Sequence, residues 1–197
     1  MENVFDSLEE QYTEWYLQEL KDAGIVNNFF FHHAKFDLVK GTHYEMVTVG
    51  KKRNSSRIMT LAQPHTYTPD FMIVWNCNNG DTMRFIKVLT NISEASRLSA
   101  YKSEQRRFFW AQPKPVKYSS IIDVKPMFTR QQSRVAVFSL KRAIMLDKFG
   151  LNVQAVIPDI LFMKTFTPKR FLRCDRSNKA RKINFHVRSL EEFLNVK

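Results

Sequence analysis

Apolar residues recur at helical spacing near the start of the chain. Leu8, Tyr12, Tyr16 and Leu20 lie four positions apart, which predicts a helix that ends close to Gly24. Ser7 precedes this run and Glu10 stands three positions later, which is the spacing of a capping box. We therefore expect the helix to begin at Ser7 and to carry a carboxylate in its first turn.

Further stretches have the β-branched and aromatic composition of strands. They cover residues 25–39 and 44–49, and a polar, basic loop is expected after them at 51–57. Pro69 has no amide hydrogen for a strand ladder, so it should mark the start of the apolar strand that follows it. Asp70 would then stand at the mouth of that strand.

The second half of the chain has a strand, a helix and a strand in succession. Residues 119–125 are β-branched and apolar, residues 138–150 form an amphipathic helical pattern closed by a glycine, and residues 153–157 are again apolar. This order implies a parallel crossover in a mixed sheet. The pattern as a whole predicts an α/β protein.

Charge is distributed unevenly along the chain. The 197 residues carry a net charge of +12, but the first 81 have −4, whereas residues 82–118 have +6 and residues 164–197 have +7. Such basic blocks favour a polyanionic partner, nucleic acid before membrane. The hydrophobic content of 44% is that of a folded protein, which excludes a disordered chain.

Cysteine and histidine give no sign of a zinc site. Cys77 and Cys174 lie far apart and form neither a zinc pattern nor a disulfide framework, which favours a reducing interior. The adjacent His32 and His33 have no further ligand at suitable spacing, so we interpret them as structural or incidental. The acidic N-terminus is unlike a signal peptide, and no apolar run is long enough to span a bilayer.

Asp123 and Lys125 form the pair with the most specific chemistry. They lie two positions apart on a predicted strand, so their side chains share one face of it. A charged pair on a half-solvated strand is one explanation. On a mostly buried strand, however, both charges are costly unless they are used. A divalent metal and a phosphate would use both, the carboxylate as a ligand and the ammonium beside the phosphate or the attacking water.

Asp70 and a glutamate on the first helix could complete such a site. Asp70 follows a proline at a strand start, although an aspartate there can also bond to its own turn. The capping box accounts for Glu10 on structural grounds, whereas helical phase favours Glu9 as the inward carboxylate. The residues by themselves leave this choice open.

Four short motifs follow one another in a definite order. They are F-D-S-L-E-E at 5–10, Y-T-P-D-F at 67–71, I-D-V-K at 122–125 and F-S-L-K-R at 138–142. In this order they resemble the PD-(D/E)XK nuclease superfamily, and more closely its phage-type endonucleases related to Holliday-junction resolvases. The resemblance implies a restriction-endonuclease-like core, which is a mixed central β-sheet flanked by helices, and Mg²⁺-dependent cleavage of DNA.

The resemblance also implies roles for individual residues. Its first-helix pattern, F-D-S-x-x-E, selects Glu10 over Glu9. Glu10, Asp70 and Asp123 would then hold Mg²⁺, for which Mn²⁺ could substitute, and Lys125 would stabilise charge during phosphodiester hydrolysis. All four would form the catalytic set.

The expected domain organisation follows from where the motifs lie. Residues 1–160 would form the nuclease-like core, with a basic helical insertion at 82–118, and residues 161–197 a basic C-terminal arm or small subdomain. Candidate DNA contacts are the cations of these basic parts and of the helix after Lys125. They are Lys141, Arg142, Arg106, Arg107, Lys169, Arg170, Arg173, Lys179, Arg181 and Lys182.

Two classes of function follow. The first is a Mg²⁺-dependent, phage-encoded endodeoxyribonuclease of the host cytoplasm, structure-selective in the manner of a junction resolvase and a homodimer by analogy. The second is a non-catalytic DNA-binding or virion-associated protein on the same fold, because a fold does not guarantee its chemistry. For either class the expected partner is DNA and not a membrane. Replication-recombination proteins or virion proteins are possible further partners. An RNA-binding role lacks an RNP-type aromatic motif.

Overall fold

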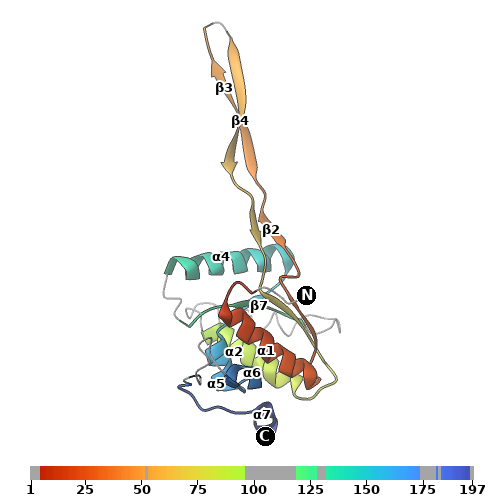
Figure 1. Ribbon diagram of the computed structural model, residues 1–197. Coiled ribbons are helices and arrows are strands. Elements are labelled where there is room, and N and C mark those ends of the chain that lie inside the picture. Colours follow the sequence, from red (N-terminus) through yellow and green to blue (C-terminus); the bar gives the residue numbers. More distant parts are fainter. Residues whose placement is uncertain are drawn as a thin grey trace.

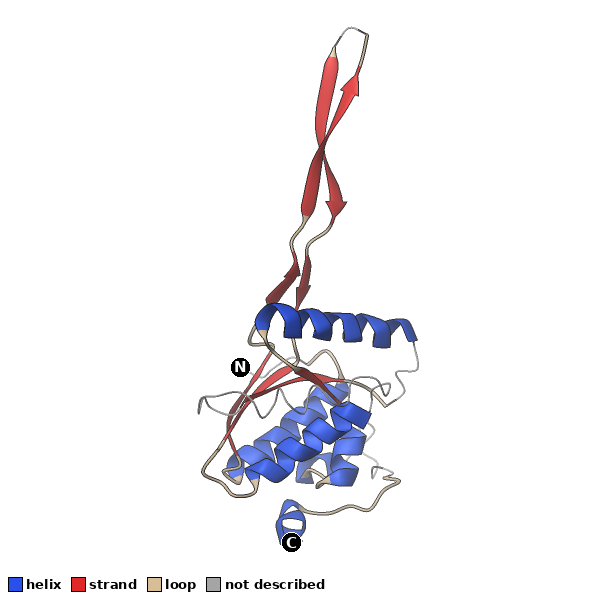
Figure 2. Cartoon of the chain, turned by 180° about the vertical axis from the view of Figure 1, so that it is seen from behind, coloured by secondary structure: helices blue, strands red, loops and turns tan. Residues whose placement is uncertain are grey.

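The structure is a computed structural model that describes residues 5–51, 53–95, 119–127, 132–173, 181 and 183–195. Helices cover both faces of a small sheet, and a long two-stranded arm projects from the body (Figures 1 and 2). The helices are α1 Leu8–Asp22, α2 Thr82–Ala95, α4 Gln132–Phe149, α5 Pro158–Lys164, α6 Lys169–Arg173 and α7 Leu190–Asn195. The strands are β1 Val26–Phe31, β2 Phe36–Val39, β3 Thr42–Val49, β4 Asn54–Ala62, β5 His65–Tyr67, β6 Phe71–Trp75, β7 Ser119–Val124 and β8 Val153–Val156.

The central sheet is mixed, as the sequence predicted. Its strand order is β1-β6-β7-β8, with β1 and β7 both antiparallel to β6 and with β8 parallel to β7. Helix α4 connects β7 to β8, so the predicted parallel crossover is confirmed. Among the described residues, no helix combines the length and the apolarity needed to cross a membrane.

Helix α1 begins and ends where its sequence predicted. The Ser7 hydroxyl caps the helix by accepting a hydrogen bond from the Glu10 amide at 3.2 Å. At the other end Gly24 adopts a positive φ of 70°, which a residue with a Cβ rarely does. Between these ends, Tyr16, Leu17 and Leu20 are buried against the sheet. The helix is therefore fixed both by its caps and by its apolar face.

Two hydrophobic clusters lie on opposite faces of the sheet. The larger one packs α1, α2 and α5 against Phe71, Ile73 and Trp75 of β6. The smaller one lies under α4, where Met145 meets Ile121 and Val153. Figure 1 shows the same division, with α4 on one side of the sheet and the other core helices on the opposite side. The strand residues alternate between the two clusters because successive side chains point to opposite faces.

Two segments differ from the expected domain organisation. Residues 82–95 form α2, whose Phe85, Ile86 and Leu89 are buried in the larger cluster, so they belong to the core rather than to a basic insertion. Residues 96–118 lie outside the described part of the chain. The C-terminal segment likewise contributes core side chains, among them Phe162, Phe166 and Phe193. Its described residues are therefore packed into the body.

The arm is the other departure from the sequence prediction. Strands β3 and β4 pair antiparallel from Thr42 opposite Ala62 to Val49 opposite Asn54. The expected loop at 51–57 is thus shorter, and residues 54–57 already belong to β4. They were interpreted as loop because both faces of this strand are exposed, so the sequence lacks the alternation of a half-buried strand.

Candidate functional site

The two predicted aspartates meet where neighbouring strands separate. In the antiparallel pair of β6 and β7, Phe71 lies opposite Ile122. Asp70 directly precedes β6 and Asp123 directly follows Ile122 on β7, so the two residues lie near each other at this end of the strand pair. The Asp70 carboxylate also accepts a hydrogen bond from the Val124 amide, at the point where β7 has left the ladder with β6.

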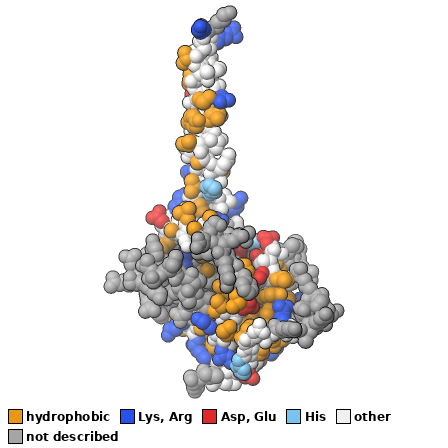
Figure 3. Space-filling model, turned by 90° about the vertical axis from the view of Figure 1, so that its left-hand side faces the viewer, with side chains coloured by type: hydrophobic (Ala, Val, Ile, Leu, Met, Phe, Trp, Pro, Cys, Tyr) orange, Lys and Arg blue, Asp and Glu red, His pale blue; other side chains and the backbone are white. Residues whose placement is uncertain are grey.

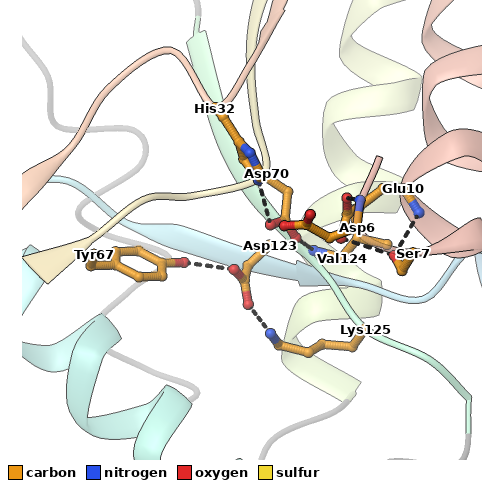
Figure 4. Close-up of polar contacts among 9 residues, drawn as sticks. All are labelled: Asp6, Ser7, Glu10, His32, Tyr67, Asp70, Asp123, Val124 and Lys125. Atoms are coloured by element: carbon orange, nitrogen blue, oxygen red, sulfur yellow. Dashed lines mark hydrogen bonds and ion pairs between the residues drawn. The ribbon is translucent and has the colours of Figure 1, made fainter. Parts of the chain in front are cut away.

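Asp123 is held by two side chains. The Tyr67 hydroxyl donates to its Oδ1 at 2.9 Å, and the Lys125 ammonium forms an ion pair with its Oδ2. The aspartate is only 4% exposed. Figure 4 shows Tyr67 and Lys125 each reaching a different oxygen of this carboxylate. Strand alternation therefore brings Asp123 and Lys125 together, as predicted.

The first turn of α1 supplies a third carboxylate. Glu10 is buried, and its two oxygens accept hydrogen bonds from the Ser7 hydroxyl at 2.9 Å and from the Asp6 amide at 3.0 Å. It is thus a capping residue and a site residue at once. Glu9 lies near Asp159 instead. After burial, the negative charge of Glu9 is the next cause of the raised pKa of Asp159. Glu10, not Glu9, lies beside Asp70 (Figure 4).

His32 belongs to the same cluster, although the sequence analysis set it aside. Strand β1 pairs with β6 so that Phe31 lies opposite Phe71, and the next residue, His32, donates its amide to the Asp70 carbonyl at 3.0 Å. Its Nε2 lies 3.6 Å from Asp70 Oδ1. Its φ of 45° is unusual for a residue other than glycine, and such conformations concentrate at functional sites.

Asp6 and His32 extend the candidate metal site beyond the predicted ligands. With Glu10 they form the single group of three among the described residues whose ligand atoms all lie within 4.8 Å of one another. The predicted ligands Glu10, Asp70 and Asp123 do not converge this closely. Asp6 had a sequence signal, since it stands in the same motif as Glu10. His32 had none, because its place depends on the pairing of β1 with β6, which joins residues some forty positions apart.

The crowding of carboxylates shifts the protonation of Asp70. Its pKa is raised to about 7, chiefly by burial and then by the negative charge of Asp123, with a smaller effect of Glu10. The hydrogen bond from Val124 opposes this shift. Burial, followed by the charge of Asp123, also raises the pKa of Tyr67, so its hydroxyl remains a donor. A cation placed among these groups would relieve the repulsion.

A cavity of about 410 Å³ opens beside Asp123. Its lining residues come from β5, β7, the segments that follow these two strands, and α4, and they are Thr66, Tyr67, Thr68, Asp123, Lys125, Val137, Phe138 and Lys141. The ammonium of Lys125 lies 5.0 Å from the ring of Phe138, and that of Lys141 lies 5.4 Å from the ring of Tyr67. Two cations and two aromatic rings therefore line one cavity next to the buried carboxylate.

The other predicted DNA contacts have varied environments. Arg142 is buried, and its guanidinium donates to Asn152 Oδ1 at 2.9 and 3.1 Å, so it joins α4 to the loop before β8. Several C-terminal cations lie on the body, with Arg170 over the ring of Trp15, Arg181 over Phe171, and Lys169 paired with Glu191. Arg173 is exposed at the end of α6. Arg106, Arg107, Lys179 and Lys182 lie outside the described residues.

No model of a protein family, no curated protein and no solved structure matches this chain. The class of protein must therefore be inferred from the geometry of the site itself.

Proposed function

We propose that the protein is a divalent-metal-dependent endodeoxyribonuclease with a restriction-endonuclease-like core. The observation that carries this proposal is that Asp70, at the start of β6, and Asp123, on the adjacent strand β7, lie near each other, with Lys125 paired to Asp123. Residues 53 positions apart in the sequence thereby form one charged site at the edge of the sheet. A phage origin and a preference for branched DNA remain part of the proposal through the resemblance of the motifs.

The donor groups fit a hard divalent cation. Carboxylate oxygens dominate the cluster, and oxygen ligands are those that Mg²⁺ and Mn²⁺ prefer. Asp70, Asp123 and Glu10 would hold the ion, for which their carboxylates would have to draw closer together than they lie here. Asp6 and His32, whose ligand atoms lie within 4.8 Å of that of Glu10, would border it. When bound, such an ion neutralises a phosphate and lowers the pKa of water, which is the chemistry that phosphodiester hydrolysis needs.

The protein's own side chains would position the DNA strand. Lys125 and Lys141 line the cavity next to Asp123, so a phosphodiester drawn there would lie against two ammonium groups. Tyr67 keeps the Asp123 carboxylate turned toward this cavity through its hydrogen bond. Hydrolysis would add water across one P–O bond, and the nearby ammonium of Lys125 would stabilise the additional negative charge.

Cleavage assays test the proposal directly. Branched, nicked and linear DNA should be cut in the presence of Mg²⁺ or Mn²⁺ and not in a chelator. Asp123→Asn should reduce the rate by at least about 100-fold, because it removes a ligand charge at the reacting phosphate. Asp147→Asn is the matched control, since Asp147 is an exposed aspartate on α4.

Calorimetric titration with Mn²⁺ separates loss of the site from loss of the fold. Asp123→Asn should bind Mn²⁺ more weakly while keeping the circular dichroism spectrum of the wild type. Equal cleavage by the wild type and by Asp123→Asn would refute the proposal. DNA binding without strand breaks under any metal condition would favour the non-catalytic DNA-binding protein.

A further inference from the structure

The arm, residues 36–67, contributes to the core only at its base, where Leu38 and Tyr67 join the smaller cluster. Of the arm side chains that the structure describes, only Leu38 and Tyr67 are buried, whereas β3 and β4 have exposed residues on both faces. Val47, Val49 and Ile58 are 56–79% exposed although they are apolar. A solitary two-stranded ribbon is at best marginally stable in water, so a ligand that covers it would stabilise it.

Charge on the arm indicates which kind of ligand fits it. Residues 36–67 carry a net charge of +3, whereas the other residues of the first 81 carry −7. Lys51, Arg53 and Arg57 lie at or near the tip and are exposed, and the described residues include no carboxylate within ion-pair distance of them. Figure 3 shows Lys and Arg side chains gathered at the far end of the arm. Such a group attracts a polyanion and repels a second copy of the same tip.

The turn at the tip is built to present these cations. A Cβ on Gly50 would lie 2.6 Å from the Arg53 carbonyl oxygen, closer than real Cβ contacts, so only glycine fits there. The tight turn places Lys51 and Arg53 at the end of the ribbon, and Arg57 follows on β4.

The base of the arm is fixed to the candidate active site. Tyr67 ends β5 and donates to Asp123. On the other strand, the Lys148 ammonium of α4 donates to the carbonyl oxygens of Asp37 and Leu38, both at 3.1 Å. The arm therefore leaves the body in a direction set by the same residues that hold the site.

We propose that the arm is a second DNA-binding element, which holds the duplex about one helical turn from the cleavage site. At about 3.3 Å per strand residue the tip lies roughly 40 Å from Tyr67, which corresponds to about 12 base pairs of B-DNA. A two-stranded ribbon fits the major groove, where cations meet phosphates and guanines and aliphatic side chains meet thymine methyl groups. The position of the cut relative to the arm rests on the proposed nuclease function. The binding of DNA by the arm does not depend on it.

Equilibrium binding without divalent metal tests the arm separately from cleavage. The arm variant combines Lys51→Gln, Arg53→Gln and Arg57→Gln. The control variant makes the same charge change on exposed body positions, with Lys21→Gln, Lys87→Gln and Lys164→Gln. On a duplex of about 30 base pairs, the arm variant should bind about 10- to 100-fold more weakly at low salt, and its slope of log K against log salt should be smaller by about 2 to 3.

Duplex length gives a second readout. The wild type should gain affinity when the duplex is lengthened from about 10 to about 30 base pairs, because only the longer one reaches from the body to the tip. The arm variant should lose most of this gain, and the control variant should keep it. Arm and control variants with the same affinities on both lengths would overturn the inference.

Light scattering tests whether a second copy of the chain covers the arm instead. A wild-type dimer that becomes a monomer in Val47→Thr with Ile58→Thr would assign the arm to self-association and overturn the inference. Failure of metal-dependent cleavage, with arm-dependent binding intact, would remove only the nuclease proposal. Loss of arm dependence, with cleavage intact, would remove only the role of the arm in binding DNA.

Discussion

Asp70 occupies the centre of the candidate site. Its backbone is bonded to His32 on one side, its side chain to Val124 on the other, and Asp123 lies near it. Burial and these neighbours raise its pKa to about 7, whereas an aspartate in an unfolded chain has a pKa of about 4. The charged form of the Asp70 carboxyl is therefore destabilised as long as no cation is bound.

This destabilisation predicts a pH-dependent effect of Asp70→Asn on stability. Between pH 4 and 7 the folded protein holds a proton that the unfolded chain releases, so the wild-type stability falls as pH rises and levels off above about 7. In a chelator at pH 8, the asparagine variant should be more stable by about 1–4 kcal/mol, and at pH 4 this difference should nearly vanish. Denaturant titrations at the two pH values measure it, and a difference independent of pH would contradict the explanation.

His32 gives a second prediction at the scale of single residues. If its imidazole borders the metal site, His32→Ala should lower the affinity for Mn²⁺ by about 10-fold. His33→Ala is the matched control, because His33 is exposed and stacks on Phe30 away from the cluster. Calorimetry measures both affinities, and equal binding by the two variants would exclude His32 from the site.

The sequence could identify Asp123 and Lys125 but not His32, for a physical reason. The strand alternation that puts Asp123 and Lys125 on one face is local, so their spacing is enough to predict it. The position of His32 depends on the register of β1 against β6, a long-range pairing that no local pattern encodes. Likewise, that Glu10 rather than Glu9 lies beside Asp70 depends on how α1 packs on the sheet.

At the scale of elements, the pairing of β6 with β7 decides whether the two aspartates meet. The buried indole of Trp75 donates to the Ser120 hydroxyl at 2.9 Å and so links the two strands. Ser120→Ala should lower the free energy of unfolding by about 1–3 kcal/mol, because the indole N–H would remain buried without its partner. Ser119→Ala, one residue away and exposed, should change it by less than about 0.5 kcal/mol, which thermal unfolding of both variants can check.

The sequence predicted a helix or strand correctly where its local pattern of residues matches the way it packs in the fold. The caps of α1 and the β7-α4-β8 crossover were predicted because glycine, serine and the apolar spacing all indicate them. Helix α2 was assigned to an insertion because its segment is basic, although Phe85 and Leu89 are buried. The start of strand β4 resembles a loop in sequence because its residues are polar and exposed.

At the scale of the whole molecule, the C-terminal segment closes the core under α1. Its composition is basic, but the hydroxyl of Tyr16 donates to that of Thr165 at 3.1 Å in the interior. The cations of this segment extend over aromatic rings at the surface, with Arg188 beside Phe193 as one example. Charge thus indicates where the chain meets solvent, and it does not reveal that the same segment fills the interior.

Phe166 tests whether this segment belongs to the core. Its ring is fully buried and stacks on Tyr16, with centroids 4.5 Å apart, between α1 and the edge of Phe85. Phe166→Ala should therefore lower the free energy of unfolding by about 3–5 kcal/mol, in a single transition that includes the sheet. Leu172→Ala, a substitution on the same segment at a partly exposed position, should cost less than about 1.5 kcal/mol. If the segment were a separate appendage, Phe166→Ala would leave the unfolding midpoint of the sheet unchanged, and denaturant titration followed by circular dichroism distinguishes the two cases.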